Sequence, residues 1–293
     1  MYISIRDALL CDPALGMPAD TARALGVGAV EIALRDDFTV CAMDSKGTVP
    51  LRSAADAAAY RSRVADMGLR LAAFLTSCDF SVGPQTATVD WVVRAIERAQ
   101  AACVPVVRID SAMARERELD FETRVGLFAE GLAKALARTD GADVALGIEN
   151  HGFQGNNLAF LLHVFRGAGS PRLGVTLDTG NFYWRGYPLS EVYGILALLA
   201  PHAKHTHLKN IRYPDDVRET VREAGWEYEQ CVAPLDEGDI DHAKVVRLLD
   251  AAGCDGDLCI EDESLGRYPT GEERFAVLQR DVRHVRAILD ALR

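Results

Sequence analysis

The chain has 293 residues, of which 49% are hydrophobic and 26% are charged, enough for a large core under an ordinary charged surface. Its formal net charge of −11 argues against a nucleic-acid backbone as the main partner, because phosphate binding needs a basic surface. No signal-peptide pattern opens the sequence, and no run approaches the roughly 18 apolar residues of a membrane span. The seven cysteines are scattered without a CxxC pair. We therefore expect a cytoplasmic protein that makes no membrane contact and keeps its thiols reduced.

Segments with the hydrophobic pattern of strands alternate with segments of helical periodicity along the whole chain. The predicted strands cover residues 2–5, 29–33, 70–75, 104–109, 144–149, 173–178, 203–208 and 257–261. The predicted helices cover residues 18–25, 54–67, 88–101, 118–137, 157–167, 189–199, 243–252 and 272–292. Ser53 and Ser190 stand where helix N-caps are expected.

Eight strands that alternate with eight helices predict a single (β/α)8 TIM barrel, with residues 1–293 forming one domain. A doubly wound open sheet is the alternative, but the first strand–helix junction has no GxGxxG or Walker A loop. Two connections are longer than a barrel needs, namely 34–52 after the second strand and 210–238 after the seventh. Each could form a wall of a substrate site or an oligomer contact, and we expect an extra helix in the second.

Metal-capable side chains stand at or near the ends of the last four predicted strands. They are Glu149, Asp178, His207 and Glu261. The carboxyl ends of the strands in a parallel barrel meet at one rim, so these groups should gather around one point. Any one of them alone could be a core ion pair or a hydrogen-bonded core residue. Four such groups buried together without a cation would be very costly. Three carboxylates and one imidazole favour Mn²⁺, Mg²⁺ or Co²⁺ over a thiol-rich zinc site.

Other polar side chains are expected around this cluster. His151 follows Glu149 by two residues and could bind substrate or carry a proton. Arg108, at the end of the fourth strand, could bind a substrate oxygen or neutralise Glu149. Lys209 could reach a substrate oxygen or pair with Glu263.

Two further residues are expected inside the barrel, beneath the rim. Glu31 lies within the second strand, and we interpret it as a member of a core ion pair. His205 precedes His207 by two residues and therefore shares its strand face, one layer deeper. We expect His205 to support the site or the core.

The strings GIENHG, LDTGNF, HTHLKN and CIEDE, in this order and spacing, resemble the xylose isomerase-like TIM barrels, also called the sugar phosphate isomerase/epimerase superfamily. The resemblance covers the whole chain as architecture, and its specific motifs lie between Ala145 and Glu263. It implies that Glu149, Asp178, His207 and Glu261 hold one divalent ion. In the ketose epimerase branch, the glutamates that match Glu149 and Glu261 also serve as acid and base. Asn181, a candidate for substrate binding, stands where those epimerases often carry His.

The chemistry of such a centre supports several reactions. A cation that binds vicinal oxygens of a hydroxyketone acidifies the neighbouring C–H, and two carboxylates can then move the proton through an enediolate. We predict an isomerase or epimerase of a small sugar or related hydroxyketone, with the dimeric or tetrameric assembly usual among the proteins it resembles. A lyase that dehydrates a keto-polyol or 3-keto sugar, similar to inosose dehydratase, is the alternative. Seven histidines and an acidic chain disfavour an apurinic endonuclease, and the intact set of four disfavours a non-catalytic protein.

Overall fold

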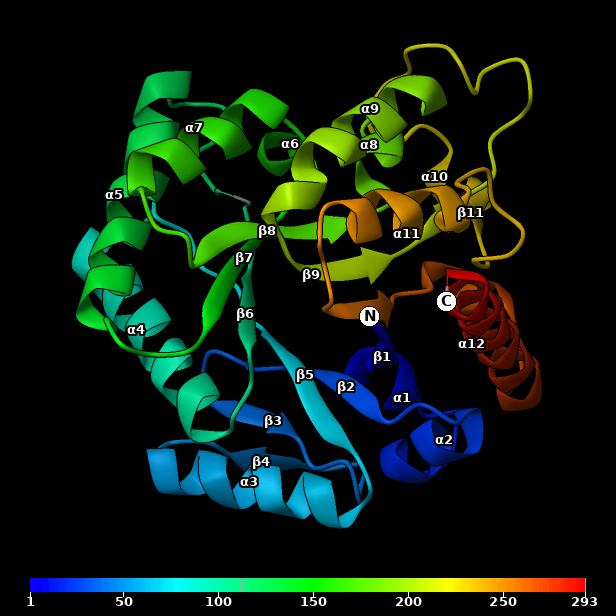
Figure 1. Cartoon of the computed structure of the whole chain (residues 1–293), viewed down its shortest axis with the longest axis horizontal. Coiled ribbons are helices and arrows are strands. Elements are labelled where there is room, and N and C mark those ends of the chain that lie inside the picture. Colours follow the sequence, from blue (N-terminus) through cyan, green and yellow to red (C-terminus); the bar gives the residue numbers. More distant parts are fainter. Residues whose placement is uncertain (112, 293) are drawn as a thin grey trace.

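The computed structural model describes residues 1–111 and 113–292, and its strands form a barrel surrounded by helices (Figure 1). Eight parallel strands close in the order β1-β12-β9-β8-β7-β6-β5-β2. Their bounds are β1 Tyr2–Arg6, β2 Ala29–Ala33, β5 Arg70–Leu75, β6 Val106–Ile109, β7 Ala145–Glu149, β8 Leu173–Asp178, β9 Ala203–Leu208 and β12 Asp257–Ile260. The closed barrel confirms the predicted (β/α)8 fold and rules out the open sheet.

The long helices lie outside the barrel, where they cover the strands (Figure 1). Their bounds are α2 Pro18–Leu25, α3 Ala54–Asp66, α4 Gln85–Ala101, α5 Phe121–Arg138, α7 Leu158–Ala168, α9 Leu189–Leu199, α11 His242–Ala251 and α12 Gly271–Leu292. Helices on the outside bury both faces of the sheet, which explains why every residue of β8 is buried. Each long helix matches one predicted from the sequence, and the ends differ by at most a few residues.

The two predicted N-caps had different outcomes. Ser53 caps α3 in a capping box. Its hydroxyl accepts a hydrogen bond from the backbone N–H of Asp56, and the Asp56 carboxylate accepts one from the backbone N–H of Ser53. The prediction for Ser190 was wrong. Pro188 has an extended backbone and occupies the cap position of α9, and the hydroxyl of Ser190 instead donates to Glu219.

Both long connections contain structure of their own. The connection after β2 forms an antiparallel hairpin of β3 (Thr39–Cys41) and β4 (Thr48–Pro50), which was not predicted from the sequence. In the connection after β9, β10 (Asn210–Ile211) pairs with β11 (Val232–Ala233). The expected extra helix there is α10 (Tyr228–Cys231), a single turn. The long yellow loop of this connection projects from the barrel in Figure 1.

The register of the strands brings polar residues to one end of the barrel. Asp178 lies opposite His207 in the β8–β9 pair, and His207 lies opposite Cys259 in the β9–β12 pair. Short helices follow the strands at this end, among them α1 (Asp7–Leu10), α6 (Gly152–Gly155), α8 (Asn181–Trp184) and the 3₁₀ turn η2 (Glu263–Arg267), while the 3₁₀ turn η1 (Ala200–His202) leads into β9. None of the helices in the described part of the chain is long and apolar enough to cross a membrane.

Candidate metal centre

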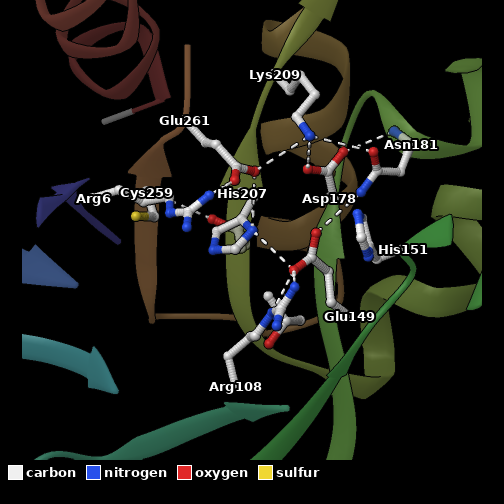
Figure 2. Close-up of polar contacts among 12 residues, drawn as sticks. Arg6, Arg108, Glu149, His151, Asp178, Asn181, His207, Lys209, Cys259 and Glu261 are labelled. Carbon is white, nitrogen blue, oxygen red and sulfur yellow. Dashed lines mark hydrogen bonds and ion pairs between the residues drawn. The ribbon is translucent and has the colours of Figure 1, made fainter. Parts of the chain in front are cut away.

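The structure brings the four predicted metal-capable side chains together at the carboxyl ends of the strands. Glu149 ends β7, Asp178 ends β8, His207 lies near the end of β9, and Glu261 directly follows β12. Each offers one ligand atom, and these atoms all lie within 4.8 Å of one another. All four residues are buried, with at most 4% of their surface exposed. Their side chains turn toward a common point in Figure 2.

Three atoms of this cluster are buried and have no hydrogen-bond partner among the described residues. They are Asp178 Oδ2, His207 Nδ1 and Glu261 Oε2. His207 Nε2 lies 3.0 and 3.1 Å from the two oxygens of Glu31, so we assign the ring proton to Nε2. The other nitrogen, Nδ1, then presents a lone pair 3.1 Å from Glu261 Oε2 and 3.5 Å from Glu149 Oε2.

A nitrogen lone pair and carboxylate oxygens that face each other in a buried space repel unless positive charge lies between them. The donor set of this cluster therefore fits a divalent cation. Three carboxylates and one imidazole match the oxygen-rich preference of Mn²⁺ or Mg²⁺ and are also compatible with Co²⁺.

Each of the two glutamates is bound by an arginine. The Arg108 guanidinium, near the end of β6, contacts Oε2 of Glu149, and the Arg6 guanidinium, at the end of β1, contacts Oε1 of Glu261. Burial alone would raise the pKa of Glu149, but the charges of Arg108 and His207 outweigh burial and hold this pKa well below its usual range. Glu149 is therefore ionised at neutral pH. Arg108 does neutralise Glu149, one of the two roles expected for it.

Lys209 and Asn181 border the cluster on the side of β8 and β9. Lys209 Nζ lies 2.7 Å from Glu263 Oε1, which confirms the expected pairing, and 3.4 Å from Asp178 Oδ2. The side-chain amide of Asn181 donates to Glu149 Oε1 at 3.1 Å and accepts from Lys209 Nζ at 3.3 Å. These contacts place both side chains within reach of a molecule bound at the cluster, and their binding of substrate stays a prediction.

His151 differs from the other candidates because 47% of its side chain is exposed. Its Nδ1 lies 3.2 Å from Asp110 Oδ1, and Asp110 Oδ2 lies 3.4 Å from the Arg108 guanidinium. The hydrogen bond with Asp110 raises the pKa of His151, although burial opposes the shift. His151, Asp110 and Arg108 thus connect solvent to buried Glu149.

A cavity of about 350 Å³ adjoins this connection. It is lined by Asp36, Ser77, Cys78, Asp79, Asp110 and Ala114. Asp110 is the residue that this cavity shares with the connection to Glu149, and the cavity offers space for a small ligand.

Several contacts beneath the cluster were not predicted. Glu31 does form the expected core ion pair, with Arg6 Nε 3.3 Å from its Oε2, but its contact with His207 was missed. Arg6 was not recognised as a candidate, although it ends β1 just as Glu149 ends β7, so the rule of strand ends would have found it. His205 lies one layer below His207, as expected, and hydrogen-bonds to Asp257.

Comparison with known proteins gives a match along most of the chain. A family model described as "Xylose isomerase-like TIM barrel" matches residues 19–288. No curated protein sequence matches the chain.

Solved structures share the fold at low sequence identity. A D-psicose 3-epimerase from Clostridium cellulolyticum H10, solved with D-tagatose, has a TM-score of 0.72 and 11% identity over 99% of both chains. The IOLI protein, described with a binding zinc atom, has a TM-score of 0.70 and 14% identity over 96% of both chains. A mannonate dehydratase from Streptococcus suis serotype2 has a TM-score of 0.68 and 14% identity, covering 100% of this chain and 96% of its own.

Proposed function

Because the chain belongs to the xylose isomerase-like TIM barrel family, we propose that it is a divalent-metal-dependent isomerase or epimerase of a small sugar or related hydroxyketone. The observation that carries this proposal is the cluster of Glu149, Asp178, His207 and Glu261, whose ligand atoms lie within 4.8 Å of one another. Three buried atoms of the cluster lack a hydrogen-bond partner among the described residues, as expected where an ion binds. The solved structures with this fold include an epimerase described with a sugar.

Glu149, Asp178, His207 and Glu261 would hold one Mn²⁺, Mg²⁺ or Co²⁺ ion. When bound, the ion would polarise the substrate and so acidify the C–H on the carbon next to the carbonyl. Lys209 Nζ and the amide of Asn181 border the same space and would donate hydrogen bonds to substrate oxygens. Two positively charged arginines behind the glutamates limit the repulsion among the carboxylates.

Glu149 and Glu261 are the acid–base pair of the proposal. Their strands, β7 and β12, are separated in the barrel by β8 and β9, so the two carboxylates reach the cluster from different sides. Glu261 Oε2 has no hydrogen-bond partner among the described residues, and Lys209 Nζ lies 3.5 Å from it, so this carboxylate keeps more of its capacity to accept a proton from carbon than Glu149 does. Both oxygens of Glu149 are engaged, by Asn181 and by Arg108. Glu261 would therefore remove the proton and, once protonated, could return it to the neighbouring carbon in an isomerisation. In an epimerisation, Glu149 would take up a proton from solvent and deliver it to the opposite face of the substrate.

A lyase is the second candidate, and two observations favour it. Asn181 occupies a position where ketose epimerases of this family often carry His, and its amide, which contacts Glu149 and Lys209, cannot carry a proton as an imidazole does. His151 is partly exposed and paired with Asp110, so it would protonate a departing hydroxyl group and exchange the proton with solvent. A mannonate dehydratase is among the structures with this fold.

Incubation of the protein with a panel of ketoses and inososes in D₂O tests both candidates. The protein is first stripped with a chelator and then supplied with Mn²⁺, Mg²⁺ or Co²⁺. An isomerase or epimerase incorporates deuterium at the carbon next to the carbonyl and forms a new sugar, whereas a lyase forms an absorbing enone. Glu261→Gln should abolish the reaction, and Glu130→Gln, at an exposed glutamate on α5, should not. If no compound reacts with any of the ions, the proposed function is wrong.

A further inference from the structure

A chain of buried polar side chains lies directly beneath His207. Glu31 is its centre: Oε1 lies 2.9 Å from His205 Nε2 and 3.0 Å from His207 Nε2. Glu31, His205 and His207 are each at most 1% exposed. Glu31 comes from β2, while both histidines come from β9, and two strands separate β2 from β9 in the barrel. The contact therefore crosses the barrel interior.

Each of the two carboxylates in this series, Asp257 and Glu31, accepts hydrogen bonds from both of its neighbours. The hydroxyl of Ser4 donates to Asp257 Oδ2, and His205 Nδ1 donates to Asp257 Oδ1 at 2.8 Å. His205 donates from its other nitrogen to Glu31, which leaves the Glu31 carboxylate as acceptor for His207. A carboxylate can only accept, so His207 must donate from Nε2. The chain thus leaves Nδ1 as the lone-pair nitrogen that faces the cluster.

Arg6 links the same carboxylate to the other side of the centre. Its Nε lies 3.3 Å from Glu31 Oε2, and its Nη1 contacts Glu261 Oε1 (Figure 2 shows Arg6 beside Glu261 and His207). Two members of the cluster, His207 and Glu261, are therefore held in place through one buried carboxylate and one arginine.

The group beneath the cluster could also be taken for a metal site of its own. Donor atoms of Glu31, His205, His207 and Cys259 lie within 4.8 Å of one another. However, the Glu31 oxygens already face N–H groups of His205, His207 and Arg6, and Cys259 Sγ stands 3.9 Å away. An ion at this point would displace these N–H groups and lie next to the guanidinium. The contacts favour a hydrogen-bonded support over a second ion.

We propose that Glu31, backed by His205 and Asp257, positions His207 by fixing its ring orientation and its protonated nitrogen, and thereby sets the affinity of the centre for its divalent ion. The inference rests on the proposed metal centre, and it assigns to these three residues a role that does not require contact with substrate. Loss of the hydrogen-bond partner of a metal-binding histidine typically weakens metal binding by about 10–100-fold. Glu31 touches His207 directly, whereas Asp257 acts through His205, so the effect should be larger at Glu31.

Calorimetric titration of the chelator-stripped full chain with Mn²⁺ tests the proposal. Wild type should bind one ion, Glu31→Gln should bind it about 10–100-fold more weakly, and Asp257→Asn should show a smaller loss. Asp239→Asn is the matched control. Asp239 is also a buried carboxylate, but its hydrogen bonds are with Tyr183 and Tyr213, which do not belong to the series of side chains beneath His207. Its affinity should equal that of wild type. The visible spectrum of bound Co²⁺ should change in Glu31→Gln and stay the same in the control.

The other possible results of the titration separate failure of the positioning role from failure of the proposed function. Wild-type affinity in a folded Glu31→Gln variant overturns the positioning role while the proposed function stands. Two ions per wild-type chain, with one lost in Cys259→Ser, would show that the group beneath the cluster is itself a metal site and overturn the proposal. If wild type binds no ion, the proposed function fails. Circular dichroism establishes folding, and if Glu31→Gln does not fold, unchanged affinity in both Asp257→Asn and His205→Gln overturns the proposal.

Discussion

The buried ion pair between Arg108 and Glu149 allows the charge balance of the centre to be measured. Only 7% of the Arg108 side chain and 2% of the Glu149 side chain are exposed. Arg108→Gln removes the positive charge and leaves the carboxylate buried. Removing one partner of a buried ion pair typically lowers the free energy of unfolding by about 3–5 kcal/mol, because the remaining charge stays buried, away from water, without its partner. We expect this loss in the free energy of unfolding of the metal-free protein.

A matched exposed pair provides the control. Arg63 pairs with Asp44, and about two fifths of both side chains are exposed. Exposed pairs contribute about 0–1 kcal/mol, so Arg63→Gln should change stability little. The two variants make the same chemical substitution and differ in burial.

The divalent ion should partly replace the missing guanidinium. An ion bound beside Glu149 supplies positive charge, and a ligand that binds only the folded state raises its stability. Mn²⁺ should therefore stabilise Arg108→Gln more than it stabilises wild type. The assay is urea unfolding, followed by circular dichroism, with EDTA and with excess Mn²⁺. The reasoning is refuted if Arg108→Gln in EDTA loses no more stability than Arg63→Gln, or if the ion stabilises Arg108→Gln and wild type equally.

Three further predictions concern other parts of the barrel. Burial lowers the pKa of His242 from 6.5 to about 4, so the contribution of its neutral ring to the free energy of unfolding is complete above pH 6.5 and is lost as the pH falls toward 4. Over this range, the free energy of unfolding of wild type, measured by urea titration, should fall by about 3 kcal/mol more than that of His242→Asn. Parallel pH curves for the two proteins would contradict the assignment. Gly174→Ala should lower stability by about 1–3 kcal/mol, since its Cβ would lie 2.0 Å from a backbone carbonyl oxygen, whereas Gly194→Ala on α9 meets nothing within 4 Å and should be neutral or stabilising in the same measurement. The Sγ atoms of Cys11 and Cys41 lie 2.7 Å apart, so exchange with oxidised glutathione should join them in a disulfide, with each thiol losing one hydrogen and the oxidant leaving as two glutathione thiols. Peptide mass spectrometry that finds both cysteines still reduced after this treatment would contradict the prediction.

The architecture could be predicted because it depends on features that are local in sequence. Strand and helix periodicity alternated eight times, and only one common parallel fold closes with that number. The four residues of the cluster could also be predicted, because all parallel strands of a barrel point the same way. A residue at the end of any strand, such as Asp178, therefore reaches the same rim as Glu149.

The hairpin of β3 and β4 could not be predicted in the same way. Its strands have three residues each, too few to establish an alternating pattern, and β4 ends in proline. The two strands pair because the connection folds back on itself, and hydrophobic periodicity does not report such a reversal of the chain.

The sequence by itself determined the barrel and the residues that its strand ends carry, because both follow from repeating local patterns. Only the tertiary structure decided that Glu31 supports His207 and that Arg6 binds Glu261. The Glu31–His207 contact joins residues 176 positions apart across the barrel interior. The two residues lie on β2 and β9, which two other strands separate in the closed barrel. Which side chains meet across the interior depends on how the barrel closes and on the register of its strands, and the pattern within a single strand reports neither.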